Sequence, residues 1–311
     1  MITKKKYEVA VIVINYNTSD YTQKCIESIF EKTAQNIDFQ IVLIDNCSEK
    51  TDYLKLKSFV DQLHSDKIQL VRNNINVGFG AGNMLGVHYS NALYLAFVNN
   101  DSYLTNDCLS IIIDAMKKDN KMGICGPLAH TENGKLLPTI DHFASPTREI
   151  LSRKFLEFIN RKKYPNRKKI YTHPQKAQFV SGSFMVVKTN DFNEVGGFDT
   201  NIFLYYEETD LCKRLAKIHK FAYLIPEAHF IHYHGISTPK SLGIKIELKI
   251  SLLYVIRKHY SYFAFKFLLT YLQIQYFIKS IFKPKYWKLF YVLLIGAPLS
   301  KSLKTKQIIK P

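Results

Sequence analysis

The chain has 311 residues, of which 47% are hydrophobic and 22% are charged, with 13 glycines and 10 prolines. This length allows one large domain, or a domain with an appendage, and is enough to bury a sizeable core. The composition excludes a disordered chain, a collagen-like repeat and a small disulfide-stapled protein.

The formal net charge of +17 is concentrated in two segments. Residues 238–311 contain 14 lysines and arginines and a single acid, Glu247, and residues 148–176 contain 10 basic residues and two acids. The rest of the chain has 19 basic and 23 acidic residues. Basic segments beside a nearly neutral core indicate docking onto an anionic surface.

The five cysteines are widely spaced and form no C-x-x-C pair, which favours reduced thiols in a cytosolic compartment. Lys4–Lys6 precede an apolar run over residues 9–14, but this run is too short for the hydrophobic region of a signal peptide. We therefore expect a cytoplasmic protein.

In the first hundred residues, short β-branched runs alternate with longer amphipathic ones, which predicts βαβ units and a parallel sheet. We expect strands over residues 9–14, 40–44, 68–71 and 93–98, and helices over residues 19–31, 51–64 and 81–90. Polar residues follow three of these strands, at 15–17, 45–46 and 99–101. Such strand ends line the ligand crevice of an open α/β sheet, so a ligand site is predicted there.

The pattern weakens after Gly126-Pro127. The basic residues 141–176 predict a loop with one helix near residues 149–160. A strand is expected over residues 178–187, a helix over 211–218 and a last strand over 221–225. The composition changes near residue 240, so we expect a domain boundary there.

Acidic residues and histidines cluster at three of the predicted element ends: Asp101; Glu207, Glu208 and Asp210; and His232 and His234. If these segments meet at one edge of the sheet, they supply oxygen ligands, an imidazole and a spare carboxylate. Mg²⁺ favours one or two carboxylates together with phosphate oxygens, so this set suits a cation that holds a diphosphate. The spare carboxylate is a candidate base for an incoming hydroxyl.

Several motifs resemble those of family 2 glycosyltransferases with the GT-A fold, in the rhamnosyltransferase-like branch that builds bacterial surface polysaccharides such as O-antigen and capsule. They occur in the family's order between residues 9 and 237: VIVINYN at 11–17, IDN at 44–46, RN at 72–73, NVGF at 76–79 with Asn83, VNND at 98–101, VSGS at 180–183, GGFD at 196–199, YEETDL at 206–211 and HYHGIS at 232–237. As a set these motifs are strongly specific. The resemblance implies a Rossmann-like, mostly parallel mixed α/β sheet flanked by helices. With the change in composition near residue 240, we expect residues 1–240 to form the catalytic domain and 241–311 a helical, membrane-associating region.

The resemblance also implies roles for individual residues. Tyr16 and Asp45 match positions that hold the nucleotide base, and Asp101 matches the last residue of the D-x-D metal motif. His232 matches a histidine that approaches the same Mg²⁺ or Mn²⁺, and Glu208 stands at the position of the catalytic base, which is usually Asp. The remaining positions implied for the nucleotide sugar are Asn17, Arg72, Gly78, Asn83, Asn99 and Asn100.

Two departures from the family pattern leave alternatives open. The D-x-D position reads Asn99-Asn100-Asp101, which retains one carboxylate. Because Glu208 is longer than Asp, Glu207 or Asp210 is an alternative base. Asp101 alone is a common turn or helix cap, Glu207-Glu208 is favoured in a solvated first helical turn, and His234 and Asp210 are expected to be structural.

The glycines at 78, 80 and 82 do not make a dinucleotide fingerprint, because Asn83 occupies the required third glycine and the segment follows the third strand. We expect them instead to allow close packing of a helix start. The chain contains no P-loop motif, and no cysteine has the local signature of a nucleophile.

The last 74 residues hold 14 of the 42 aromatic residues, interleaved with lysines and arginines. The longest uncharged runs, 267–278 and 289–300, are 12 residues each, shorter than the roughly 20 that a spanning helix needs. This pattern favours helices that lie in the interface of an anionic membrane over nucleic-acid binding. A helical bundle packed on the catalytic domain is the alternative.

With these observations, the resemblance implies an inverting, metal-dependent transferase on the inner face of a bacterial membrane. The resemblance also implies that it moves rhamnose from dTDP-rhamnose, or otherwise a hexose from a UDP-sugar, to a polyprenyl-linked or growing polysaccharide acceptor. A non-catalytic membrane- or polyanion-binding protein that retains the fold is the main alternative, and a nucleotidyltransferase is the third.

Overall fold

The computed structural model describes residues 6–233 and 241–309. Its strands are β1 (Tyr7–Asn15), β2 (Phe39–Asp45), β3 (Ile68–Arg72), β4 (Ala92–Asn99), β5 (Ser102–Leu104), β6 (Met122–His130), β7 (Leu136–Leu137), β8 (Ile140–Asp141), β9 (Gln175–Ala177), β10 (Phe179–Val180), β11 (Phe184–Lys188) and β12 (Phe221–His232). Its α-helices are α1 (Ser19–Lys32), α2 (Lys50–Gln62), α3 (Gly78–Tyr89), α4 (Cys108–Lys118), α5 (Pro146–Leu151), α6 (Arg153–Ile159), α7 (Thr189–Glu194), α8 (Glu207–Lys217), α9 (Leu242–His259), α10 (Tyr262–Phe282) and α11 (Trp287–Leu294).

The main sheet has ten strands along the path β3-β2-β1-β4-β11-β6-β12-β5, with β7 beside β6 and β9 beside β12. The first four strands of this path are parallel, β11 is antiparallel to both of its neighbours, and β12 is parallel to β6. The carboxyl ends of β1, β4 and β12 therefore reach the same edge of the sheet. This topology explains how His232, at the end of β12, comes to lie beside the residues that follow β4.

Helices cover both faces of the sheet. Successive residues of a strand point to opposite faces, and both sets of side chains are apolar. Along β1, Val9, Val11 and Val13 belong to the cluster that includes α1, α2 and α4, whereas Ala10 and Ile12 belong to the cluster that includes α3, α7 and α8. All seven residues of β2 are buried, as expected for a parallel strand covered on both faces. The expected mixed, mostly parallel α/β sheet flanked by helices is confirmed.

The expectations for the middle of the chain need correction. The weak pattern at Gly126-Pro127 lies inside β6, where the adjacent strand β12 has an irregularity between Ile225 and His229 that accommodates a proline. The single helix expected near residues 149–160 is two helices, because Ser152 between them takes a positive φ of 78°.

Three further expectations differ in their bounds. The strand expected over residues 178–187 is split into β10, which pairs with β8, and β11, which joins the main sheet. Helix α8 begins at Glu207, four residues before the expected start, and β12 continues to His232. Residues 234–240, with His234 and the expected boundary near 240, lie outside the described residues.

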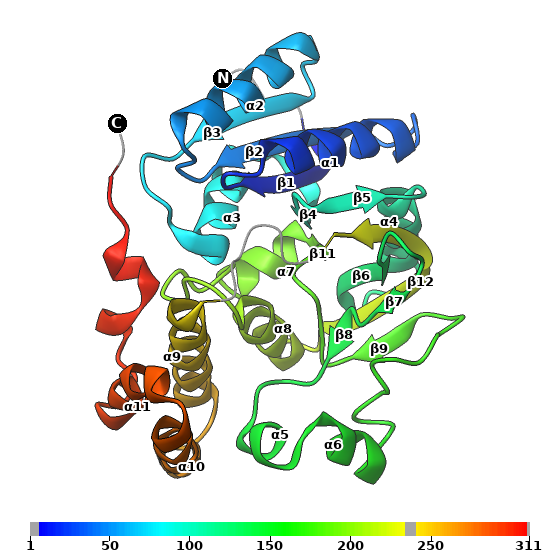
Figure 1. Ribbon diagram of the computed structural model, residues 1–311. Helices are drawn as coiled ribbons and strands as arrows, with labels where there is room; N and C mark the ends of the chain where they lie inside the picture. The colour runs from blue at the N-terminus through cyan, green and yellow to red at the C-terminus, as the bar shows by residue number, and fades with distance from the viewer. Residues whose placement is uncertain (1–5, 234–240, 310–311) are drawn as a thin grey trace.

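The C-terminal helices pack against one another and against the rest of the chain. Helices α9, α10 and α11 share an apolar cluster with Ala144. From α9, the Ser251 hydroxyl donates to the Leu204 carbonyl at 2.8 Å, and Tyr254 and Lys258 contact the Asp199 carboxylate at 2.9 and 2.6 Å. Figure 1 shows these three helices together, beside α8 and away from β2 and β3. Among the described residues, no helix combines the length and the hydropathy needed to cross a bilayer.

Candidate active site

A cavity of about 720 Å³ opens at the edge of the sheet where β1, β4 and β12 end. The predicted site residues that line it are Tyr16, Gly78, Asn83, Asn99, Asn100, Asp101, Glu207, Glu208 and His232. They come from the ends of three strands and the starts of α3 and α8. The structure thus brings together segments that lie more than 100 residues apart in sequence.

Asp101 and His232 meet at the floor of this cavity. Asp101 is only 5% exposed, and its Oδ1 atom lies 3.1 Å from Nε2 of His232. The backbone reinforces the contact, because the amide of Tyr233 donates to the carbonyl of Asp101 at 3.0 Å and Ser102 pairs with His232 across β5 and β12.

These two side chains fit a divalent cation that a diphosphate would share. A carboxylate oxygen and an imidazole nitrogen converge in the cavity wall, and hard cations such as Mg²⁺ complete their coordination with phosphate oxygens and water. Among the described residues, no three His, Cys, Asp or Glu side chains are grouped so as to hold a metal ion. The chain therefore offers part of a cation site rather than a complete cage.

The first turn of α8 carries Glu207 and Glu208 into the cavity. The two residues before it, Tyr205 and Tyr206, both have φ of 72°, in the left-handed region that costs non-glycine residues about 1–2 kcal/mol each. Such backbone strain is concentrated at functional sites in proteins. Here it turns the chain sharply, so that the helix starts with its acidic residues at the cavity wall.

The two glutamates differ in their surroundings. Glu207 is 2% exposed and its Oε1 atom has no hydrogen-bond partner among the described residues, so burial, followed by the nearby charge of Glu208, raises its pKa well above the ordinary value. Glu207 therefore favours its neutral form. Burial also raises the pKa of Glu208, but Glu208 lies between the main cavity and a second pocket of about 270 Å³. Glu208 is thus the better placed base.

Asp210 has a structural role, as expected. Burial alone would raise its pKa, but the hydrogen bond from His259 and the charges of Arg214 and Lys258 lower the pKa below the ordinary range. Its carboxylate lies 2.7 Å from Arg214, 2.9 Å from Lys258 and 2.7 Å from His259. Because Lys258 and His259 belong to α9, Asp210 fastens the C-terminal helices to α8 and leaves no free oxygen for base catalysis.

The start of α3 packs closely against the segment before α8. Gly78 has φ of 82°, and a Cβ at this position would lie 2.1 Å from the carbonyl oxygen of Phe203. The amide of Phe79 donates to that same oxygen at 3.0 Å, and Asn83 donates to the carbonyl of Phe79. The expected close packing of a glycine-rich helix start is confirmed.

Three predicted nucleotide-binding residues do not line the cavity. Asp45 is fully buried, where Asn15 donates to one carboxylate oxygen at 3.0 Å and Arg72 lies 3.7 Å from the other. Arg72 also covers the ring of Tyr53 at 4.0 Å, and the Asn17 side chain accepts from the amide of Glu49. A nucleotide base would reach Asp45 only after this network had opened, so its assignment to the base stays a prediction.

Asn99 and Asn100 occupy the positions of the metal motif without a charge. The amide group of Asn100 donates to the hydroxyls of Thr18 and Thr22 at 2.6 and 2.8 Å, which ties the end of β4 to α1. The backbone N–H of Asn99 donates to the backbone carbonyl of Ser183 at 2.8 Å. Both residues hold the chain that carries Asp101.

Sequence reasoning missed other residues of the cavity wall. Asn46 bridges to the loop before α3 through Asn76 and the carbonyl of Gly78, at 3.0 and 3.3 Å. The cavity is also lined by Ser181, Gly182, Ser183, Phe203, Tyr205, Ile244, Leu303 and Gln307. The VSGS motif at 180–183 was a usable signal, whereas nothing local marked Ile244, Leu303 and Gln307 as parts of this site.

Comparison with known proteins identifies the chain's family. Residues 10–196, more than half of the chain, match the family described as glycosyl transferase family 2. The chain belongs to glycosyl transferase family 2. This membership, with the sheet and cavity described above, shows a GT-A glycosyltransferase fold.

Two relatives within this family span most of the chain. Rhamnosyltransferase WbbL of Escherichia coli (strain K12) is 27% identical over 266 residues, which cover 80% of this chain and 93% of the relative. N-acetylglucosaminyl-diphospho-decaprenol L-rhamnosyltransferase of Mycobacterium tuberculosis (strain CDC 1551 / Oshkosh) is 22% identical over 243 residues, which cover 73% and 76%. The family 2 chain thus resembles enzymes named for rhamnosyl transfer.

Solved glycosyltransferases share the fold at low identity. GalNAc-T7, crystallised with UDP, GalNAc and Mn²⁺, superposes with a TM-score of 0.61 at 13% identity, over 81% of this chain and about half (48%) of that one. The mannosyltransferase PcManGT of Pyrobaculum calidifontis, in complex with GDP-Man and Mn²⁺, has a TM-score of 0.57 at 13% identity and covers 96% of this chain and 88% of its own.

Proposed function

We propose that this family 2 protein transfers a sugar, with inversion at the anomeric carbon, from a nucleoside diphosphate donor to a hydroxyl of a lipid-linked or growing bacterial polysaccharide. The observation that carries the proposal is that Asp101, Glu208 and His232, which come from three distant segments, line one cavity. Family membership supports sugar transfer as the class of reaction.

In the proposed reaction, Glu208 accepts the proton of the acceptor hydroxyl, and the hydroxyl oxygen attacks the anomeric carbon as the bond to the diphosphate breaks. A single displacement of this kind inverts the anomeric centre. Asp101 and His232 would hold Mg²⁺ or Mn²⁺, which neutralises the charge that develops on a leaving diphosphate. Glu207 stays neutral beside the base, so it avoids adding a second negative charge where the nucleophile forms.

For the donor, we propose dTDP-rhamnose first and a UDP-hexose second. Two relatives named for rhamnosyl transfer support the sugar. Tyr16 lines the cavity and supplies an aromatic surface for a nucleotide base. A thermal-shift panel of dTDP-rhamnose and UDP-hexoses tests this choice, because a ligand that binds only the folded state raises the melting temperature.

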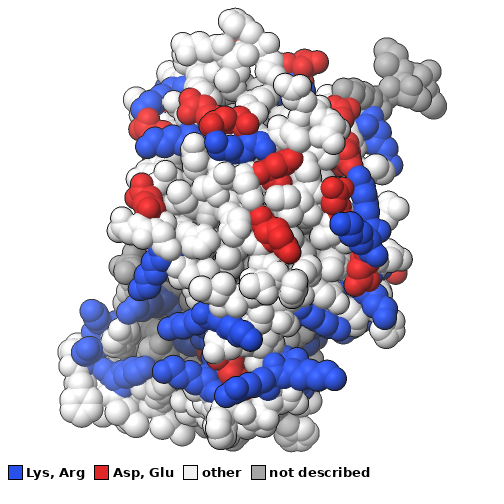
Figure 2. Space-filling view, turned by 90° about the vertical axis from the view of Figure 1, so that its right-hand side faces the viewer, with Lys and Arg blue, Asp and Glu red and all other residues white. Residues whose placement is uncertain are grey.

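We also propose that the protein works on the anionic cytoplasmic face of the membrane. Figure 2 shows lysines and arginines gathered toward the lower end of the molecule, which carries α5, α6, α10 and α11 in Figure 1. Large apolar side chains protrude from helices at that end: Phe158 (78% exposed), Phe263 (83%), Phe267 (65%) and Phe282 (78%). Exposed aromatic residues beside basic ones suit a helix that lies in a membrane interface.

Vesicle binding tests this surface. Removal of the C-terminal region would break its contacts with Asp199 and Asp210, so substitutions are the cleaner probe. We expect Phe263→Ser with Phe267→Ser to reduce pelleting with anionic vesicles severalfold. Leu54→Ser, at a half-exposed apolar position on α2, should bind like wild type. Equal pelleting of all variants would refute the proposed surface.

Donor turnover tests the chemistry. Nucleotide-sugar hydrolysis and transfer should require Mn²⁺ or Mg²⁺, and Glu208→Gln should lower transfer by about 10²–10⁴-fold while donor binding persists. Glu227→Gln, at an exposed glutamate on β12, is the matched control. Metal-independent binding without turnover would identify a non-catalytic protein that keeps the fold. Release of diphosphate instead of nucleoside diphosphate would identify a nucleotidyltransferase.

A further inference from the structure

A second pocket, of about 270 Å³, lies next to the donor cavity. Ser181, Tyr205 and Glu208 line both spaces, so the proposed base stands where they adjoin. A molecule seated in this second pocket would lie within reach of Glu208 without occupying the donor cavity. The pocket is therefore positioned for the acceptor.

Three arginines line this pocket: Arg148, Arg153 and Arg167. The Asp141 carboxylate holds two of them through their Nε atoms, Arg153 at 2.9 Å and Arg167 at 3.1 Å. No hydrogen bond joins the terminal Nη atoms of these two guanidinium groups to any described residue. Asp141 thus holds the Nε atoms of Arg153 and Arg167, and their Nη groups remain available to a ligand.

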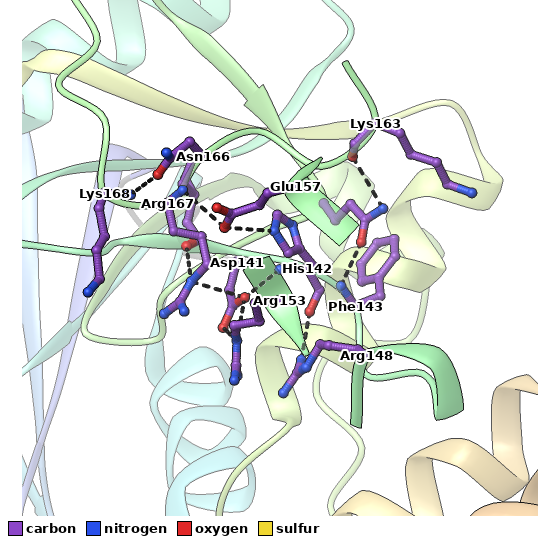
Figure 3. A network of polar contacts seen from close by, with 12 residues as sticks. Asp141, His142, Phe143, Arg148, Arg153, Glu157, Lys163, Asn166, Arg167 and Lys168 are labelled. Atoms are coloured by element: carbon purple, nitrogen blue, oxygen red, sulfur yellow. Dashed lines mark hydrogen bonds and ion pairs between the residues drawn. The ribbon is translucent and has the colours of Figure 1, made fainter. Parts of the chain in front are cut away.

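Arg148 completes the cluster from α5. It is 6% exposed, and its Nη1 atom donates to the carbonyl of His142 at 2.6 Å, while its Nε atom lacks a hydrogen-bond partner among the described residues. Figure 3 shows the guanidinium ends of all three arginines turned toward the same side of Asp141 and His142. A buried guanidinium with an unused donor costs free energy unless a hydrogen-bond acceptor, such as an oxygen of a bound anion, satisfies it.

Four acids lie close to the three arginines, and two of them, Asp141 and Glu208, line the same pocket. Asp141 faces Arg153 and Arg167, and Glu149 is shared between Arg148 at 3.3 Å and Lys249 at 3.9 Å. Glu157 contacts the ring of His142 at 3.3 Å instead of a guanidinium group. Phosphate groups match this arrangement, because the planar guanidinium fork binds their oxygens in pairs.

The pocket also continues toward the end of the molecule that carries α10 and α11. Leu248 lines both this pocket and a neighbouring cavity of about 460 Å³ between α9 and α10. That cavity is bordered by Lys245, Lys249, Lys279 and Lys283 and by Phe282, whose side chain is 78% exposed. A diphosphate with a hydrocarbon chain would place its charge on the arginines and its chain along α10.

We infer that Arg148, Arg153 and Arg167 bind the diphosphate of a prenyl-diphosphate-linked acceptor and so present its sugar hydroxyl to Glu208. This inference rests on the proposed transfer reaction and adds the residues that bind the diphosphate of its acceptor. Free inorganic pyrophosphate shares the anionic group but lacks the chain, so the two sources are separable by experiment.

The test measures binding and turnover separately. Binding of farnesyl diphosphate and of inorganic pyrophosphate is followed by calorimetry in the presence of Mn²⁺ and saturating nucleoside diphosphate, which occupies the donor cavity. We expect wild type to bind farnesyl diphosphate at least tenfold more tightly than pyrophosphate. Arg153→Gln and Arg167→Gln should each weaken farnesyl diphosphate binding at least tenfold, with partial recovery in Arg153→Lys. Arg161→Gln, at an exposed arginine of the same basic segment, is the control.

Steady-state transfer gives the second readout. The Arg153 and Arg167 variants should raise KM at least tenfold for an N-acetylglucosaminyl diphosphate carrying a short prenyl chain, whereas Arg161→Gln should not change it. Unchanged farnesyl diphosphate binding in both variants, or equal affinity for pyrophosphate, would overturn the inference and leave the proposed function standing. Loss of binding in the variants of a protein that shows no donor turnover would support the anion site and reject the transfer reaction.

Discussion

The buried carboxylate of Asp210 offers a test of how the C-terminal helices are held. Asp210 has no exposed surface and lies within 2.9 Å of Arg214, Lys258 and His259. Asp210→Asn keeps the shape of the side chain but leaves these groups facing a neutral amide. Breaking a buried ion pair by removing one partner costs about 3–5 kcal/mol, so the free energy of unfolding should fall by about that amount.

Urea denaturation at pH 7 measures this loss. Asp61→Asn, which breaks an exposed pair with Lys57, should change stability little. Because the pKa of Asp210 is lowered in the folded state, its stabilisation is present above the ordinary value of 3.8 and is lost as the pH falls further. The difference between wild type and Asp210→Asn should therefore shrink in acid. A loss below about 1 kcal/mol at pH 7 would refute the argument that this carboxylate fastens α9 to α8.

Two further substitutions test how the close packing at Gly78 and the burial of Glu207 affect stability. Gly78→Ala should cost about 2–4 kcal/mol of unfolding free energy and raise the donor KM, because the strain of a left-handed backbone adds to a clash with Phe203. The control is Gly134→Ala, where φ is 73° and the space around the residue is open, so only the backbone strain should lower its stability. Equal losses of stability in the two variants would argue against the clash. The raised pKa of Glu207 means that wild type loses stability as the pH rises above the ordinary value of 4.5, by up to about 1.4 kcal/mol per pH unit. Glu207→Gln should remove this loss, which thermal melts from pH 5 to 8 would measure. Parallel pH profiles of wild type and variant would contradict the raised pKa.

Local patterns were sufficient to predict the elements of the first hundred residues, whereas β5, α4 and β6 were not predicted. Parallel strands that are covered on both faces must be almost continuously apolar, and the four expected ones appear as β1, β2, β3 and β4. The middle of the chain was harder, because short strands such as β8 and β10 are stabilised by pairing with distant segments rather than by their own composition.

For the site, the sequence by itself determined which chemical groups are present: one carboxylate after β4, three at the start of α8 and an imidazole at the end of β12. It could also place Asp101 at a strand end, but it ended the last strand at residue 225, seven residues before His232. The 3.1 Å contact between Asp101 and His232 depends on the order in which β4, β11, β6 and β12 pair. Strand order arises from long-range packing and leaves no mark on any single segment.

Tertiary structure alone decided three matters. It buried Asp45 in contact with Asn15 and Arg72. It gave Glu207 and Glu208 different surroundings, so that burial raises the pKa of Glu207 well above its ordinary value. It also placed three arginines in one pocket with Asp141 and Glu208: Arg148, Arg153 and Arg167. Exposure, pKa and the grouping of charges depend on what surrounds a side chain in space, and those neighbours come from everywhere in the chain. Residue types and spacing therefore predict the reaction class, whereas the folded surroundings determine which carboxylate can act as the base and which anion can bind beside it.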